Sequence, residues 1–309
     1  MTQVENLTAA ALVDGVLTPL ASAKLAMTDE GVARGDGAFE TIGVWDGQPF
    51  RLEDHLRRLD ASLTKILLPP ADADALRRDM ATLLDGVTGD AALRLYVTGS
   101  GTRIATVAPQ PARAPARHLV PQAAPWIVPP ADYAPAGAKT MSYGQNMTAT
   151  RAAKRAGGDD ALLLASDGTV LEGPTFCVFW VADDTVHSVP VERGIVDSIS
   201  RRTLRDLAMR ARHRVIDAEV GLDTLIDADE VFICSSIRPV IAVEQIGTRR
   251  FEGLDGRIFD LELVGRTTVC PGADRGGFVA QLGVLGAVGM EVAVELVEVA
   301  GDHESSPGV

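Results

Sequence analysis

A lysine in a run of small residues is the first candidate for chemistry in this chain. Lys139 is one of only four lysines, whereas the chain has 25 arginines, and it lies in residues 136–143, whose pattern predicts a buried strand. Because the other cations are nearly all arginine, a lysine here needs a reason beyond solubility. An amine forms a Schiff base with a carbonyl compound, which a guanidinium cannot do. The alternative is a structural lysine with a buried stem and a solvated amine.

A carboxylate downstream is the second candidate. Glu172 ends the apolar run of residues 169–171 and is followed by Gly173. It is either an exposed acid at the end of a strand or the partner that keeps a heterocyclic nitrogen protonated. The second role is the one that a cofactor acting as an electron sink requires.

Three further segments could bind a phosphate. Ile199 and Ser200 begin a predicted helix, where backbone N–H groups favour anions, although a serine that caps a helix explains the same residues. Ser235 and Ser236 end a predicted strand and are either phosphate donors or part of a plain turn. Arg58 is a possible clamp on the same phosphate, or an exposed arginine on a helix.

The elements that must position these residues follow from periodicity. Alternation over residues 38–45, a turn at Asp46–Gly47 and the segment from 48 predict a hairpin, and leucines at helical spacing from Leu52 predict a helix. We also expect strands at 91–98, 160–164, 169–172, 178–181, 185–189 and 230–234, and helices at 148–156 and 199–212. This mixture predicts an α+β fold in which antiparallel sheet dominates.

A proline-rich stretch divides the chain. Residues 107–131 hold many prolines and alanines, which predicts a boundary between two domains. We expect a small N-terminal domain in residues 1–118, a linker in 119–131, and a larger domain in 132–309 whose C-terminal extension begins at about residue 267.

Composition excludes several classes of partner. The net charge of −13 and the lack of a basic cluster argue against nucleic acid. Cys177, Cys234 and Cys270 lie far apart without a C-x-x-C pair, which fits a reduced cytoplasm and gives no metal site. The N-terminus lacks the apolar core of a signal peptide, and glutamates interrupt the apolar residues 278–300. We therefore expect a soluble cytoplasmic protein that binds no membrane.

Taken in order, these motifs resemble those of the fold type IV enzymes that depend on pyridoxal 5'-phosphate. This family includes branched-chain aminotransferases, D-amino acid aminotransferases, R-selective amine aminotransferases and 4-amino-4-deoxychorismate lyases. The resemblance covers roughly residues 14–256, and its clearest segments are 34–41, 55–59, 139–163, 171–175, 198–201 and 228–232. It implies a small N-terminal α/β domain, a larger domain with a barrel-like mixed sheet, and an active site between them at a homodimer interface.

The resemblance also implies roles for the candidate residues. Lys139 would form the Schiff base with the cofactor and move the proton, and Glu172 would pair with the pyridine nitrogen. The phosphate would be held by Arg58, Ile199, Ser200, Ser235 and Ser236. The chain departs from relatives at residues 174–177, where they often carry Ser-Ser-Asn, and at Ser198, which replaces a glycine. Residues from 267 on do not resemble the closing helix of the family, and a lineage-specific extension and an altered reading frame both remain open.

The sequence indicates the reaction less clearly than it indicates the cofactor. Arg34 and Arg103 are candidates for the α-carboxylate of a substrate, and Phe39 is the one aromatic in a motif that is tyrosine-rich in branched-chain enzymes. We therefore predict a transaminase for D-amino acids and 2-oxo acids that also accepts R-configured amines. The alternative is 4-amino-4-deoxychorismate lyase, which releases 4-aminobenzoate and pyruvate. A cofactor carrier without turnover is a third reading, which Lys139 and Glu172 together argue against.

Overall fold

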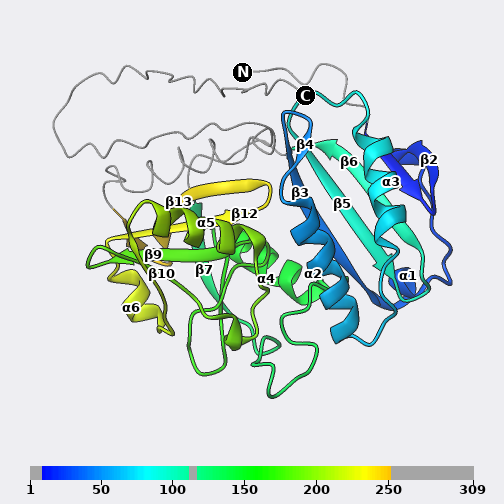
Figure 1. Cartoon of the computed structure of the whole chain (residues 1–309). Helices are drawn as coiled ribbons and strands as arrows, with labels where there is room; N and C mark the ends of the chain where they lie inside the picture. The colour runs from blue at the N-terminus through cyan, green and yellow to red at the C-terminus, as the bar shows by residue number, and fades with distance from the viewer. Residues whose placement is uncertain (1–8, 111–116, 252–309) are drawn as a thin grey trace, which may run out of the picture.

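A six-stranded sheet forms the first half of the molecule (Figure 1). The computed structural model describes residues 9–110 and 117–251. The strand order is β2-β1-β6-β5-β3-β4, and every neighbouring pair is antiparallel. The strands are β1 (Ala10–Val13), β2 (Val16–Pro19), β3 (Gly37–Trp45), β4 (Gln48–Pro49), β5 (Ala91–Thr98) and β6 (Arg103–Pro109).

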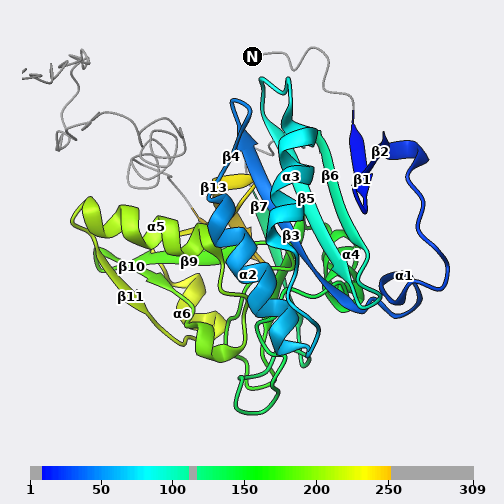
Figure 2. The same ribbon diagram turned by 45° about the vertical axis from the view of Figure 1, so that its right-hand side comes forward.

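Two helices pack on this sheet, and their apolar spacing explains why. Helix α2 (Leu52–Lys65) contacts β3, and α3 (Ala73–Leu84) contacts β6 (Figure 2). Leu56, Leu59 and Leu63 recur at helical spacing on α2 and are buried, as an amphipathic helix requires. The short helix α1 (Glu30–Arg34) and the 3-10 turn η1 (Leu20–Ser22) precede β3.

The second half is built on a mixed eight-stranded sheet. Its order is β11-β10-β9-β12-β13-β7-β8, with β14 beside β13. The pairs β10/β11, β13/β7 and β7/β8 are parallel, and the remaining pairs are antiparallel. The strands are β7 (Arg117–Ala123), β8 (Asp160–Leu164), β9 (Cys177–Ala182), β10 (Thr185–Ser188), β11 (Arg214–Asp217), β12 (Glu230–Ser235), β13 (Arg238–Ile246) and β14 (Arg249–Arg250). The helices are α4 (Gly144–Arg155), α5 (Ile199–Arg210) and α6 (Leu222–Ile226), with the 3-10 turn η2 (Val191–Arg193).

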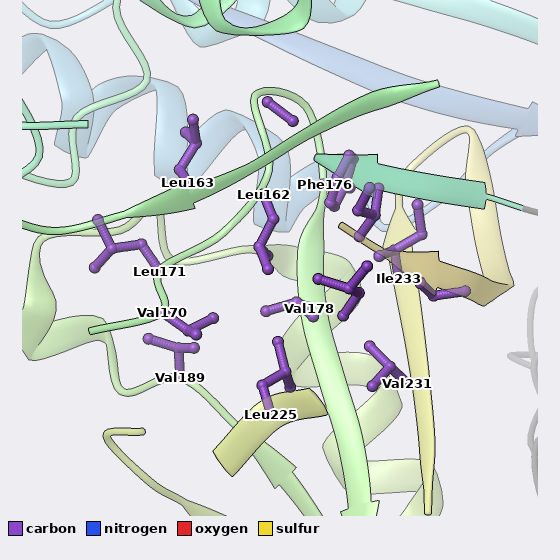
Figure 3. Packing of buried hydrophobic residues seen from close by; sticks show 14 of the residues in the cluster. Leu162, Leu163, Val170, Leu171, Phe176, Val178, Val189, Leu225, Val231 and Ile233 are labelled. Carbon is purple, nitrogen blue, oxygen red and sulfur yellow. The ribbon is translucent and has the colours of Figure 1, made fainter. Parts of the chain in front are cut away.

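Both faces of the sheet are buried at β9 and β12, which explains the continuous apolar sequence of these two strands. One face packs into the cluster drawn in Figure 3, to which Val178, Val231 and Leu162 all belong. On the other face, Phe179 and Phe232 stack with their ring centroids 5.2 Å apart. The two clusters fix the register of β9 against β12, and this register positions the ends of both strands near the site.

Much of the predicted framework is confirmed. The β3–β4 hairpin, helix α2 and strand β5 appear where periodicity predicts them, as do α5 and β12. The resemblance to a two-domain α+β fold is also confirmed, since each sheet carries its own helices. No helix in the described residues is long and apolar enough to cross a lipid bilayer.

Three predictions about local structure differ from the structure. The strand expected at 169–172 is reduced to isolated bridges, because Thr169 pairs with Gly221 and Val170 pairs with Leu164 on the other side. Residues 136–143 form turns instead of a strand, because Gly137 has a φ of 73° and an isolated bridge at Thr140 is their one pairing with β3. The linker expected at 119–131 begins with strand, since β7 lies inside the second sheet between β13 and β8. The chain therefore changes sheets between Pro109 and Arg117. The extension expected from residue 267 lies outside the described residues.

Candidate active site

Backbone hydrogen bonds to the first sheet and to α2 hold Lys139 in place. Phe39 N–H donates to Lys139 O at 3.0 Å, and Met141 N–H donates to Gly37 O at 2.9 Å. Lys139 N–H donates to Ser62 Oγ on α2 at 3.0 Å. Gly37 permits this close approach, because a Cβ there would lie 2.7 Å from Met141 Sδ. The lysine is thus positioned by elements of the first half, although it follows β7 of the second sheet in the chain.

The amine of Lys139 is poorly solvated. Its Nζ lies 4.4 Å from the ring centroid of Phe39 and 5.5 Å from that of Tyr143. Burial, together with the nearby charge of Arg58, lowers the pKa of Lys139 to about 8. A substantial fraction of the amine is therefore neutral near physiological pH, which is the nucleophilic form.

Glu172 is a buried carboxylate whose loss of solvation is offset by few hydrogen bonds. It is 8% exposed, and Val196 N–H donates to its Oε1 at 3.4 Å, the one hydrogen bond that the described part of the chain supplies to this side chain. Burial raises the pKa of Glu172 to about 8. Such a group is stabilised by a cationic N–H partner, as the resemblance implies for a protonated pyridine ring.

A cavity of about 430 Å³ brings the predicted residues together. Lys139, Glu172 and Arg58 line it, as do Ser235 and Ser236 at the end of β12. Phe39 lines it as well, and it contacts the ring of Tyr143 edge to face with the centroids 5.2 Å apart. A neighbouring cavity of about 710 Å³ shares Tyr143, Glu172 and Val196 with the first.

The start of α5 has the features of an anion site. Ser198 lines the cavity and caps the helix, accepting a hydrogen bond from Arg201 N–H at 3.2 Å. Ile199 and Ser200 are buried in the first turn behind it and do not line the cavity. Ser200 Oγ and Ser235 Oγ are buried without a hydrogen-bond partner among the described residues. Buried hydroxyls are normally satisfied, so this end of the cavity fits a ligand that accepts hydrogen bonds, such as a phosphate.

The sequence did not lead us to predict a buried network of charged side chains next to Arg58. Glu40 on β3 is fully buried and accepts hydrogen bonds from Arg58 Nε at 2.8 Å, Arg58 Nη2 at 2.6 Å and His55 Nδ1 at 2.7 Å. Burial alone would raise the pKa of Glu40, but Arg58 and His55 outweigh it and lower the pKa to about 2. The sequence itself could have indicated this network, because Glu40 is the one charged residue in residues 37–45.

This network orients Arg58 and still leaves it donors. Arg58 Nη1 donates to Asp197 O at 3.0 Å, so three of the five guanidinium N–H groups are used within the chain. The other two have no hydrogen-bond partner among the described residues. His55 Nε2 lies 3.4 Å from Ser236 Oγ, so the same network also reaches the end of β12. Through Arg58 and His55 of α2, Glu40 is therefore linked to Asp197 before α5 and to Ser236 after β12, the two segments predicted to bind a phosphate.

The structure does not bring Arg34 and Arg103 to this site. Arg34 is 70% exposed and pairs with Glu30, and Arg103 pairs with Asp79 at 2.5 Å. Neither lines either cavity around Lys139 and Glu172. Their role as carboxylate ligands stays a prediction.

Two other arginines occupy the expected place. Arg94 on β5 and Arg238 on β13 line the same cavity as Lys139. Arg94 stands opposite Thr41 of β3, and Arg238 Nη2 donates to Thr175 Oγ1 at 2.7 Å. Their positions follow from sheet register and could not be read from local sequence.

The cavity holds a lysine, a carboxylate and hydroxyl groups that suit an enzyme active site. Comparison with known proteins identifies the family of the chain. The family model for amino-transferase class IV matches residues 37–246, so the chain belongs to the class IV aminotransferases. A bifunctional aminodeoxychorismate lyase / D-amino acid transaminase from Mycobacterium tuberculosis is 33% identical over 254 residues, covering 72% of this chain and 86% of that protein. A putative branched-chain-amino-acid aminotransferase from Methanocaldococcus jannaschii is 28% identical over 262 residues, covering 80% and 88%.

The fold agrees with this membership. A hypothetical aminotransferase from Mycobacterium tuberculosis, solved with alpha-ketoglutarate and PMP bound, superposes with a TM-score of 0.78 at 27% identity and covers 86% of this chain and 100% of that one. The protein is therefore an enzyme of the class IV aminotransferase family with the fold type IV architecture.

Proposed function

We propose that this enzyme is a transaminase dependent on pyridoxal 5'-phosphate that moves an amino group between a D-amino acid and a 2-oxo acid. The observation that carries the proposal is that Lys139 and Glu172 line one cavity together with Ser235, whose buried hydroxyl has no hydrogen-bond partner among the described residues. The preference for D-amino acids is supported by the relative that is 33% identical, which is named for that activity.

The residues present fit this cofactor. When bound, pyridoxal phosphate supplies an electron-withdrawing ring that stabilises negative charge at the substrate carbon. Lys139 Nζ would bind the cofactor covalently and carry a proton to and from that carbon. The Glu172 carboxylate would hold the proton of the ring nitrogen. Arg58, Ser198, Ser235 and Ser236, with the start of α5, would hold the phosphate.

The substrate carboxylate needs a cation within the cavity. Arg94 forms no ion pair with an acid among the described residues, and it shares the cavity with Arg238. Bidentate pairing with a carboxylate suits the planar guanidinium of an arginine that lines the cavity. We infer that one or both of these arginines bind the α-carboxylate, in place of Arg34 and Arg103.

Substitution of the four arginines tests this inference. Arg94→Ala or Arg238→Ala should raise KM for D-alanine by roughly 10- to 100-fold, the loss of a charge-assisted hydrogen-bonded pair. The same variants should leave KM for an R-configured amine without a carboxylate within a few-fold, because only a charged substrate loses the contact. Steady-state kinetics on both substrates measures the difference.

Arg34→Ala and Arg103→Ala serve as the comparison set. Both remove an arginine that pairs with an acid of the first half. Little change in these two variants supports Arg94 and Arg238, whereas a KM effect confined to them would restore the sequence prediction. Equal losses on both substrates in any variant would indicate structural damage instead.

The second candidate function is the lyase that converts 4-amino-4-deoxychorismate to 4-aminobenzoate and pyruvate. The observation in its favour is that the 33% identical relative is named for both reactions. Incubating the enzyme with each substrate separates the two candidates. Amino transfer from D-alanine to 2-oxoglutarate supports the transaminase, and pyruvate release from aminodeoxychorismate without amino transfer supports the lyase.

Loss of Arg58 should weaken the cofactor more than it harms the reaction. Arg58→Ala removes two free donors, so the Kd for pyridoxal phosphate should rise by roughly 10- to 100-fold while kcat with saturating cofactor changes little. Titration followed by fluorescence measures the Kd. Arg57→Ala is the matched control, because Arg57 lies on the same helix, is 69% exposed and pairs with Asp54.

Arg58→Ala also leaves the Glu40 carboxylate buried without its cation, which is itself destabilising. The double variant Glu40→Gln/Arg58→Ala removes that unpaired charge and isolates the effect on the cofactor. An unchanged Kd in both variants would show that Arg58 only neutralises Glu40.

We also propose that the enzyme acts in the cytoplasm as a homodimer. Leu67 is 93% exposed and Tyr133 is 55% exposed, and both line the cavity of about 710 Å³ that adjoins Glu172. A second copy of the chain would cover these apolar groups. Light scattering of the purified enzyme measures its mass, and a monomer would contradict the proposal.

A further inference from the structure

Two thiols meet in the wall of the active-site cavity. Cys177 on β9 and Cys234 on β12 are direct partners in the antiparallel ladder, and their sulfurs lie 3.2 Å apart. Cys177 Sγ also lies 3.3 Å from Cys234 O and 3.5 Å from Ser198 Oγ. Both are free cysteines, and both line the cavity that contains Lys139.

The backbone geometry suits a bond between the two sulfurs. Directly opposed residues on antiparallel strands have Cα atoms about 4.5 or 5.5 Å apart, and a disulfide spans about 4.4 to 6.8 Å between Cα atoms. The bonded sulfurs would stand about 2.05 Å apart, so the existing 3.2 Å separation must shorten by about 1 Å. Rotation of the side chains can supply this movement without a change in strand register.

Access to the pair is through the cavity. Cys177 is 3% exposed and Cys234 is 1% exposed, so bulk reagents do not reach them from the outer surface. Because both residues line the cavity, a reagent small enough to enter it comes next to this pair. The buried position also keeps a second protein from competing with Cys234 for Cys177.

We propose that Cys177 and Cys234 are a modification site, at which a small peroxide that enters the cavity converts the two thiols into a reversible disulfide between β9 and β12. The Cys177 thiolate attacks one oxygen of hydrogen peroxide, the O–O bond breaks, and the displaced hydroxide takes up a proton and leaves as water. Cys177 is then a sulfenic acid. The Cys234 sulfur attacks it, the S–O bond breaks, and a second water leaves. The peroxide is reduced and the two thiols are oxidised.

The surroundings favour Cys177 as the attacking sulfur. Burial alone would raise the pKa of Cys177, but its hydrogen bonds with Cys234 and Ser198 and the charge of Arg201 lower that pKa. The pKa of Cys234 is raised by its hydrogen bond with Cys177 and by burial. The thiolate is the reactive form, so the first step falls to Cys177 and the resolving step to Cys234.

The disulfide would alter the anion-binding end of the cavity, a consequence that rests on the proposed function. Closing the bond draws Cys177 Sγ away from Ser198 Oγ at the start of α5 and acts on Cys234 beside Ser235. A site whose donors are preorganised loses affinity when they move. We therefore expect the oxidised enzyme to bind pyridoxal phosphate several-fold more weakly than the reduced enzyme.

Mass spectrometry of the full-length chain tests the modification directly. Cys270, which lies outside the described residues, is replaced by serine, and the protein is treated with hydrogen peroxide. We expect the intact mass to fall by two hydrogen atoms, a digest to contain the peptide that links Cys177 with Cys234, and dithiothreitol to reverse both. Adding Cys177→Ser or Cys234→Ser should prevent the loss of hydrogen.

The outcomes separate this proposal from the proposed function. Two thiols that still react with a thiol reagent after unfolding of the treated protein, or oxygen added to single cysteines without a linked peptide, would overturn it. If the Cys270→Ser variant fails to fold, the linked peptide is sought in a digest of the native chain. A linked peptide with equal cofactor Kd in both forms would establish the disulfide and refute its effect on the cofactor.

Discussion

Replacing Lys139 with alanine should abolish turnover, by roughly 10⁴-fold or more, and leave the fold intact. The variant loses both the covalent attachment of the cofactor and the group that moves the proton. The local backbone should survive, because Ser62, Gly37 and Phe39 hold it through main-chain atoms of residues 139 and 141. Steady-state kinetics and circular dichroism of the purified variant measure the two effects.

The folded state should even gain stability in this variant. Lys139 has an ordinary pKa of 10.5 and a folded pKa of about 8, so folding disfavours its charged form. The penalty is present at pH values below 8 and fades as the pH rises from 8 to 10.5, where the unfolded chain binds the extra proton. Alanine removes this penalty, so the free energy of unfolding at neutral pH should not fall.

Covalent labelling identifies the lysine independently of activity. Borohydride reduction of the enzyme with pyridoxal phosphate should fix the cofactor on Lys139, located by peptide mass spectrometry. Lys154→Ala is the matched control, because Lys154 is exposed on α4 and should be dispensable. Label on Lys154, or full activity of Lys139→Ala, would contradict the assignment.

Replacing Glu172 with glutamine should slow the reaction by roughly two to four orders of magnitude while the cofactor stays bound. A neutral amide cannot hold the proton on the ring nitrogen, so the ring withdraws electrons less strongly. The phosphate contacts are untouched, so the Kd for pyridoxal phosphate should change much less than kcat. Glu244→Gln, which alters an exposed acid on β13, is the control.

The same variant should remove a pH dependence of stability. The pKa of Glu172 rises from an ordinary 4.5 to about 8 on folding, so the folded state binds the extra proton between these values. Without cofactor, the free energy of unfolding should therefore fall as the pH rises from 4.5 to 8, by on the order of a few kcal/mol. Urea unfolding at both ends of this window should show the fall in the native enzyme and its absence in Glu172→Gln. The proposed role of Glu172 would be contradicted if the Glu172→Gln variant had a rate within a few-fold of the native enzyme and the same change of stability with pH.

The sequence by itself determined the chemical types at the site and the elements with strong periodicity. Lys139 and Glu172 stood out because their chemistry is unusual among their neighbours, and both line the observed cavity. The β3–β4 hairpin and helix α2 were predictable because alternation and helical spacing are local properties of the chain. The strand predicted at residues 136–143 was wrong, because small apolar residues suit a strand but Gly137 forms a turn.

Tertiary structure decided which charges and thiols meet. Arg103 was placed with the substrate by sequence, but Asp79 of α3, which folding brings close to β6, pairs with it instead. The register of β5 and β13 turned Arg94 and Arg238 toward the cavity, and that of β9 against β12 set Cys177 opposite Cys234. Glu40 meets Arg58 for a similar reason, since α2 packs on β3. Contacts of this kind depend on pairing between distant segments, which local periodicity does not encode.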